Sequence, residues 1–176
     1  NPVLREVARS VPVSEIGSAD IESVIFKMQK AMNSQKDGVA IAAPQLGVSL
    51  RVFVIAGKVF AKNSEEKRGN LDKIFINPKL IRTSKSTREM FEGCLSVRGK
   101  YGTVMRHEKA TVHAFNEKGK EFTYHGSGLI AHVFQHEIDH LNGILYPDKA
   151  VKLQKDEDWK ELKEKRAAQR KKDDQK

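Results

Sequence analysis

The sequence predicts an α+β domain in which antiparallel sheets pack around a central helix, followed by a C-terminal helix. Two observations predict this fold class. Apolar residues recur at helical spacing in 20–33 and again in 127–142. Between these segments, several short runs alternate apolar and polar residues, as half-buried strands do. Of the 176 residues, 39% are hydrophobic, which is enough apolar material for one domain core.

The N-terminal third is predicted to contain one helix and two strands. The helix covers residues 20–33, with Asp20 as the capping residue at its start. The apolar run 39–48 contains Pro44 and ends in glycine and valine, which is typical of a short strand leading into a loop. Residues 51–56 alternate and are β-branched, so they form a second strand, and the polar segment 57–71 forms a surface loop.

The middle of the sequence is predicted to consist of strands. Residues 73–81 form a strand that Pro78 interrupts, which favours an edge position or a bend. Residues 89–97 are extended with a glycine break. The segment 109–126 alternates on both sides of a turn at 116–119, which predicts a β-hairpin.

The central helix begins after Ser127 and ends near Asn142, where Gly143 can terminate it. Its buried face is formed by Leu129, Ile130, Val133, Phe134 and Leu141. We place the first domain at 1–148, ahead of the charged C-terminal segment. Residues 149–176 are expected to form a charged, basic helix or tail that packs at its start and projects into solvent at its end.

The charge and the cysteine count limit the class of protein. The net charge is +9, which suggests an anionic neighbour. Residues 149–176 contain 11 Lys or Arg and 7 Asp or Glu, so +4 of this charge lies in the tail. A single cysteine, Cys94, excludes an intrachain disulfide and favours a reducing compartment.

We expect a cytoplasmic protein without a membrane span, because the sequence contains no run of about 18 apolar residues. Since it begins at Asn1 rather than at methionine, a removed organellar targeting segment remains the alternative.

The strongest functional signal is the HExxH motif at 136–140. Residues four apart share one face of a helix, so His136 and His140 can bind the same metal ion. Glu137 projects about 100° away from His136. It can therefore take a proton from water without binding the metal. The alternative is a chance match on a charged helix, but burying two imidazoles and an acid on an apolar helix is costly without such a use.

A catalytic metal site of this kind needs a third protein ligand. No histidine follows His140, and the acids from Asp148 onward lie in a segment predicted to be surface. Cys94 can supply a thiolate, which suits a borderline metal, although a lone cysteine is more often a small core residue. His132 lies one turn before His136, but one ion cannot bridge two full turns, so we expect it to line the cleft or reach solvent. We interpret His107, His113 and His125 as surface or structural residues.

Three segments resemble the motifs of the peptide deformylase family in the same order. They are GVAIAAPQ at 38–45, EGCLS at 92–96 and QHEIDH at 135–140. The resemblance also includes NPVLREVA at 1–8 and INPKL at 76–80, and it extends to about residue 148. It implies an α+β fold and a metal-dependent amidohydrolase that removes the formyl group from N-formyl-methionyl nascent chains.

The resemblance also implies the cofactor and the roles of individual residues. The cofactor is one divalent metal ion per chain, natively Fe²⁺, with Zn²⁺, Ni²⁺ or Co²⁺ as substitutes, and a metal-bound water is the nucleophile. The ligands are Cys94, His136 and His140, the general acid/base is Glu137, and the oxyanion is bound by Gln45 and the Leu95 N–H. The methionine pocket is lined by Val39, Met90, Leu129 and Val133, with backbone contacts from Gly93. For each pocket residue, an ordinary core position is the alternative.

Two positions depart from the family pattern, which usually has glycine at Ala40 and often proline at Arg98. They put the substrate range in doubt more than the reaction. As further supporting contacts, Asp139 is close in sequence to the ligands, and Glu92 and Arg106 resemble a buried pair in the family.

The expected partners are nascent peptides, with the chain a monomer. Family members with a C-terminal helix suggest that the basic tail contacts ribosomal RNA, mainly through phosphates because Trp159 is its only aromatic residue. The alternative is a solvated helix end. Rival functions are a zinc endopeptidase, a non-catalytic nucleic-acid-binding protein with a structural metal, and an inactive deformylase.

Overall fold

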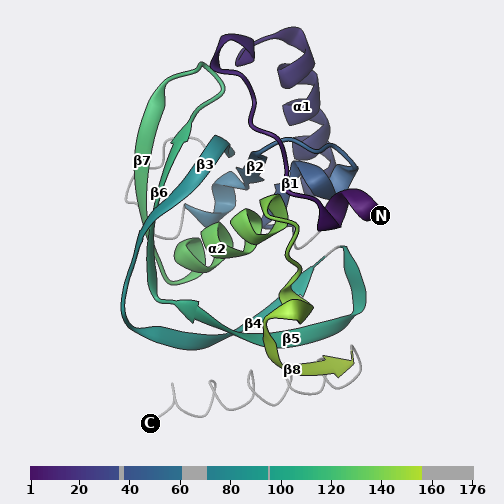
Figure 1. Ribbon diagram of the computed structural model, residues 1–176, viewed down its shortest axis with the longest axis vertical. Coiled ribbons are helices and arrows are strands. Elements are labelled where there is room, and N and C mark those ends of the chain that lie inside the picture. The colour runs from purple at the N-terminus through teal and green to yellow at the C-terminus, as the bar shows by residue number, and fades with distance from the viewer. Residues whose placement is uncertain (36–37, 61–70, 95, 156–176) are drawn as a thin grey trace. The chain divides into compact units, whose positions relative to one another are not determined.

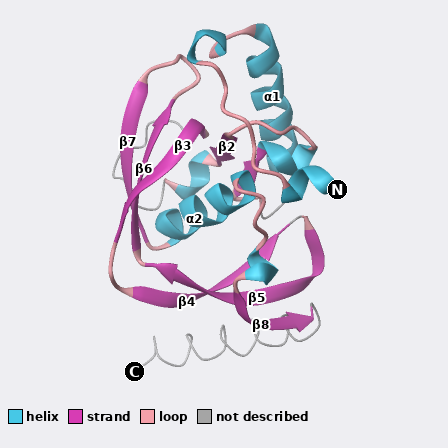
Figure 2. Ribbon diagram, viewed as in Figure 1, coloured by secondary structure: helices cyan, strands magenta, loops and turns pink. Residues whose placement is uncertain are grey.

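In the computed structural model, residues 1–35, 38–60, 71–94 and 96–155 are described, and they form helices and antiparallel sheets (Figures 1 and 2). The predicted mixture of helices with antiparallel sheets is therefore confirmed. The chain divides into two compact units. Unit 1 contains Asn1–Arg88 and Arg106–Leu145, and unit 2 contains Glu89–Met105 and the residues from Tyr146 onward.

A five-stranded antiparallel sheet forms the framework of unit 1. Its order is β1-β2-β3-β6-β7. The strands are β1 (Ala40–Ala42), β2 (Val52–Ile55), β3 (Lys73–Thr83), β6 (Lys109–Phe115) and β7 (Glu121–Ser127). β6 and β7 pair without interruption from Lys109↔Ser127 to Phe115↔Glu121, which confirms the predicted hairpin.

Strand β3 bends at Asn77–Pro78 rather than ending the sheet. The strand has a partner on each side, and its register with β6 shifts between Ile76 and Lys79. Asn77 has a positive φ of 51°. Its amide accepts a hydrogen bond from the Val11 N–H at 2.8 Å and donates one to the Val11 carbonyl at 2.7 Å. Of the two predictions for Pro78, the bend is confirmed and the edge position is wrong.

Two α-helices pack on the sheet of unit 1. α1 (Ala19–Asn33) contacts β1 and β2, and α2 (Leu129–Leu141) contacts β1, β3, β6 and β7. The N-cap of α1 is Ser18, whose hydroxyl accepts from the Ile21 N–H at 3.4 Å, so the assignment of Asp20 as the cap was wrong. Asp20 lies in the first turn, where its charge favours the positive end of the helix.

An aromatic cluster fixes the side of α2 that faces the sheet. The Phe134 ring lies 5.3 Å from Phe75 of β3 and 5.9 Å from Tyr124 of β7, measured between ring centroids. A Cβ atom at Gly126 of β7 would lie 2.7 Å from Cγ2 of Ile130. The close approach of β7 to α2 therefore requires glycine at this position.

The second sheet is three-stranded, in the order β4 (Thr87–Cys94), β5 (Val97–His107) and β8 (Ala150–Lys155). β8 pairs antiparallel with β5, so the predicted helix is wrong for residues 150–155. The sequence AVKLQK alternates apolar and polar residues, and this period of two indicates a strand despite the high charge that follows it. The rest of the predicted helix, at 156–176, lies outside the described residues.

Candidate metal centre

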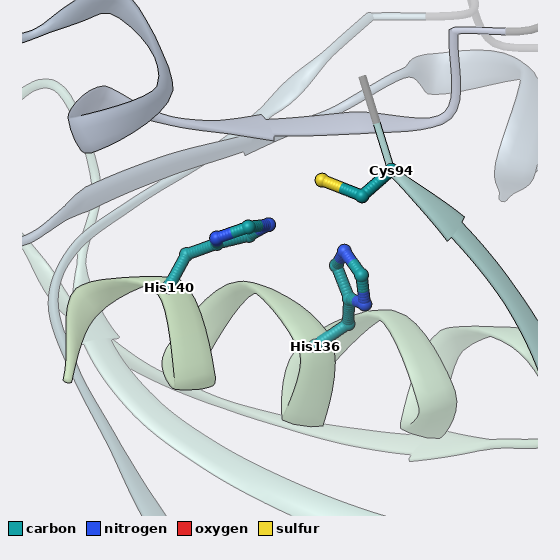
Figure 3. Close-up of side chains that lie close together, drawn as sticks. All are labelled: Cys94, His136 and His140. Atoms are coloured by element: carbon teal, nitrogen blue, oxygen red, sulfur yellow. The ribbon is translucent and has the colours of Figure 1, made fainter. Parts of the chain in front are cut away.

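His136 and His140 project from successive turns of α2, and Figure 3 shows their rings on the same side of the helix. The two ring centroids are 4.8 Å apart, with an angle of 83° between the ring planes. His140 is buried, with 1% of its surface exposed, and His136 is half-buried. Two imidazoles at this spacing can place one nitrogen each on a single ion.

Glu137 lies between the two histidines in sequence but on another side of the helix, as the 100° step requires. It is 4% exposed. Burying a carboxylate is costly unless it is paired, hydrogen-bonded or bound to a metal.

Cys94 is the last residue of β4 and is half-buried. The Ser96 N–H donates a hydrogen bond to its sulfur at 3.4 Å. Metals bind cysteine through its sulfur atom.

One potential ligand atom from each of Cys94, His136 and His140 lies within 4.8 Å of the other two (Figure 3). A thiolate with two imidazoles suits zinc or ferrous iron. Glu92, His132 and His136 also have potential ligand atoms within 4.8 Å of one another. Only the first combination uses both histidines of the HExxH motif together with the cysteine.

Gln45 lies in the short 3-10 helix Ala43–Leu46 that follows β1. Its Oε1 accepts a hydrogen bond from the Ala42 N–H at 2.8 Å. This bond directs the acceptor end of the amide toward the backbone. Leu95, the second predicted oxyanion donor, lies outside the described residues.

The predicted pocket residues differ in burial. Val133 is 6% exposed, whereas Leu129, one turn earlier on α2, is 48% exposed. Val39 and Met90 are half-buried, and Gly93 is exposed. A Cβ at Gly93 would lie 2.5 Å from Cε1 of the Tyr101 ring, so the position requires glycine for packing within unit 2. Their joint function as a methionine pocket stays a prediction.

Comparison with known proteins identifies the family. A family model described as polypeptide deformylase matches residues 1–156. The chain belongs to this family. It is 44% identical over 153 residues to a peptide deformylase of Halothermothrix orenii, covering 87% of this chain and 90% of that one. A chloroplastic/mitochondrial peptide deformylase 1A of Arabidopsis thaliana is 40% identical over 159 residues, covering 86% of this chain and 59% of that one.

Comparison with solved structures leads to the same family. A class I type b peptide deformylase from Acinetobacter baumannii, with Met-Ala-Ser bound, is 30% identical with a TM-score of 0.74. The match covers 85% of this chain and 92% of that one. Within the described part of this chain, no helix has the length and apolar character needed to cross a membrane.

Several polar contacts around the HExxH helix were not predicted from the sequence. Arg51 donates from Nη1 to the Leu141 carbonyl at 3.2 Å and to Oδ1 of Asn142 at 2.9 Å, at the negative end of α2. Partial burial lowers the pKa of the Arg51 guanidinium. Asp139 pairs with Arg106 at 2.6 Å. The predicted Glu92–Arg106 pair stays a prediction, although Glu92 is buried as expected.

Tyr146 is the second feature that sequence reasoning missed. It is 1% exposed, and its hydroxyl donates to the Lys100 carbonyl at 2.8 Å. Burial, together with the negative charges of Cys94 and Glu92, raises the pKa of Tyr146 to about 12. A tyrosine in GILYP looks like an ordinary core residue, so no pattern in the sequence indicates this environment.

Proposed function

We propose that this chain performs the reaction of its family, the hydrolytic removal of the formyl group from N-formyl-methionyl peptides, with Cys94, His136 and His140 holding one divalent metal ion. The observation that carries the ligand assignment is that these three side chains offer ligand atoms within 4.8 Å of one another. The family match over residues 1–156 supports the reaction.

The donor set fits the metal that the family requires. Three protein ligands leave a position open for water or substrate, as in catalytic rather than structural sites. When bound, the metal supplies the Lewis acidity that makes water a nucleophile near neutral pH. Fe²⁺ is our choice for the native ion, with Zn²⁺, Ni²⁺ and Co²⁺ as substitutes that the same ligands accept.

Glu137 moves the proton. Its carboxylate takes a proton from the attacking water and delivers it to the amine that leaves when the formyl C–N bond breaks. Burial at 4% exposure keeps bulk water from competing for that proton. The 100° step of the helix supports this role, because it turns Glu137 away from the direction of the two ligands and so does not require it to bind the metal.

Gln45 and the Leu95 backbone N–H are proposed to stabilise the negative charge that develops on the formyl oxygen. The support for Gln45 is that its Oε1 accepts from the Ala42 N–H, since the NH₂ group is the end of an amide that donates. Loss of one such donor typically lowers kcat by about 100-fold or more.

The methionine side chain is proposed to bind at Val39, Met90, Leu129 and Val133, with Gly93 offering backbone contacts. Leu129 and Val133 support this because they lie four residues apart on α2, on the helix side that carries His136. We propose further that α2 is the central helix of the fold. We also propose the cytoplasm as the compartment, the monomer as the oligomeric state, and ribosome contact through residues 149–176.

Two rival functions make different predictions. A zinc endopeptidase would cleave internal peptide bonds and would not depend on Cys94. A non-catalytic binding protein with a structural metal would need a closed four-ligand site. Neither accounts for family membership as simply as deformylation does.

The decisive test is formate release from formyl-Met-Ala-Ser by anaerobically purified protein, with Glu137→Gln as the matched control. We expect activity in the wild type and a loss of about 100-fold or more in the variant, with metal content unchanged. A fully metal-loaded wild type that releases no formate would refute the proposed function. Cleavage of internal bonds instead would favour the endopeptidase.

A further inference from the structure

One flank of α2 lies between its core-facing stripe and its histidine face. With 100° per residue, the stripe formed by Ile130, Phe134 and Ile138 points to the sheet, and the two histidines lie roughly opposite. Gln135 and Asp139 occupy the flank between these two sides. Both are buried, with 6% and 7% of their surfaces exposed.

The amide of Gln135 binds the backbone at the end of β5 in the way a neighbouring strand would. Its Oε1 accepts from the His107 N–H at 3.0 Å, and its Nε2 donates to the His107 carbonyl at 2.9 Å. Nε2 also donates to the Ala131 carbonyl at 2.8 Å, one turn earlier on the helix. All three bonds lie within unit 1, so the side chain joins the helix to the strand at one defined point.

A second bond extends this connection by one turn. Arg106, the residue before His107, donates from Nη1 to Oδ2 of Asp139 at 2.6 Å. Their side chains are only 4% and 10% exposed. Two consecutive residues of β5 thus hold two residues of α2 that lie four apart. Charge-assisted and paired amide bonds of this kind have defined lengths and directions.

Apolar packing alone leaves the rotation of a helix less defined, because burial of apolar surface is non-directional. A rotation of about 10° moves an atom at the outer helix radius of about 5–6 Å by about 1 Å. Metal–ligand distances tolerate only about 0.2 Å. The histidine face therefore needs a directional restraint close to it, and Gln135 is the residue immediately before His136.

We propose that Gln135 is a positioning residue, whose bonds to the His107 backbone set the rotation of α2 and so the geometry of the His136–His140 pair. This inference rests on the proposed metal centre. It assigns to Gln135 no contact with metal or substrate. If Gln135 has this role, its substitution should change metal affinity and coordination geometry strongly, and should change the free energy of unfolding to a smaller extent.

The chain offers a matched control at Asn77, whose amide makes the same pair of bonds to the Val11 backbone far along the sequence from α2. Gln135→Met keeps the side-chain length and removes all three bonds. Asn77→Gly removes the corresponding pair and tolerates the positive φ of 51°. Both variants leave one backbone N–H and one carbonyl without their side-chain partner, and Gln135→Met also removes the bond to the Ala131 carbonyl.

The experiment measures Co²⁺ binding to each full-length protein by competition with a chelator, the visible spectrum of the Co²⁺ form, and unfolding in urea. We expect Gln135→Met to bind Co²⁺ about 10- to 100-fold more weakly, as loss of supporting contacts commonly causes, and to shift the ligand-field bands. Asn77→Gly should keep both, although it loses stability to a similar degree. Gln135→Glu, which keeps the acceptor for the His107 N–H, should fall between wild type and Gln135→Met.

Equal Co²⁺ affinity and an unchanged spectrum in Gln135→Met would overturn the positioning role, as would the same change in Asn77→Gly. If Gln135→Met does not fold, Gln135→Glu decides by the same two readouts. A wild type without sulfur-to-cobalt charge transfer would overturn the metal centre itself, and the positioning role with it. Failure of the inference alone leaves wild-type cobalt binding and formate release intact.

Discussion

Helix α2 and strand β4, which carry the proposed metal ligands, differ in the hydrophobic packing that holds them in place. The helix buries Ile130, Phe134 and Leu141 in the main hydrophobic cluster of unit 1. Among the described residues, that cluster includes none from unit 2, where Cys94 lies. The sheet that carries Cys94 depends instead on the Tyr146 ring, which packs where Gly102 leaves room. The helix that carries the histidines therefore packs on a large hydrophobic core, whereas the sheet that carries Cys94 has a small core in which Tyr146 packs closely against Gly102.

The largest effects should come from removing a ligand on each side of this comparison. His140→Ala and Cys94→Ser should each weaken metal binding by more than about 100-fold, because even supporting contacts contribute 10- to 100-fold. His140→Ala should also lower the free energy of unfolding of the metal-free protein, since His140 is 1% exposed. Cys94→Ser should leave that free energy nearly unchanged. Chelator competition and urea unfolding test both, and full metal affinity in either variant would refute that ligand.

The same comparison explains what the sequence could predict. His136, His140 and Glu137 follow from one local pattern, because helix geometry places residues four apart together. Cys94 was a candidate third ligand because no histidine follows His140, whereas the roles of Gln45 and Leu95 came only from the family resemblance. Arg51 could not be found, since its contact to Leu141 joins residues 90 apart in sequence. The helix predicted for residues 150–155 was wrong for a different reason. The prediction rested on the high charge of the segment, although the residues alternate with the period of a strand.

A glycine-to-alanine substitution in each sheet tests the difference in packing between the two sheets. Gly126→Ala would place Cβ 2.7 Å from Cγ2 of Ile130, and Gly102→Ala would place it 2.9 Å from Cε2 of Tyr146. Gly126→Ala should destabilise the whole protein by about 1–3 kcal/mol, the usual effect of overpacking a core. Gly102→Ala should mainly loosen the small sheet, so iodoacetamide should alkylate metal-free Cys94 faster. Equal alkylation rates in both variants would contradict the idea that packing at Gly102, and not at Gly126, supports the strand that carries Cys94.

Arg51→Met tests how much the contacts of Arg51 stabilise the C-terminal end of α2. The variant loses the donors to Leu141 and Asn142 and a positive charge at the negative end of α2. We expect a loss of about 1–2 kcal/mol, near the lower range for hydrogen bonds from charged groups, because the side chain is only partly buried. Urea unfolding measures it. Arg51→Lys, which keeps the charge but not the forked donors, should recover only part of the loss.

The smallest effect is expected at Tyr146, on the cysteine side. Tyr146→Phe removes one neutral hydrogen bond to the Lys100 carbonyl and should cost about 0.5–1.5 kcal/mol near neutral pH. The folded protein raises the pKa of Tyr146 from 10.0 to about 12, so it binds this proton more tightly than the unfolded chain does. The resulting stability is complete below pH 10 and is lost as the pH rises toward about 12. Unfolding measured from pH 9 to 11.5 should therefore show a steeper decline for the wild type than for Tyr146→Phe. Parallel curves would mean that the small sheet opens to solvent before the tyrosine ionises, and that its fit is looser than the packing at Gly102 implies.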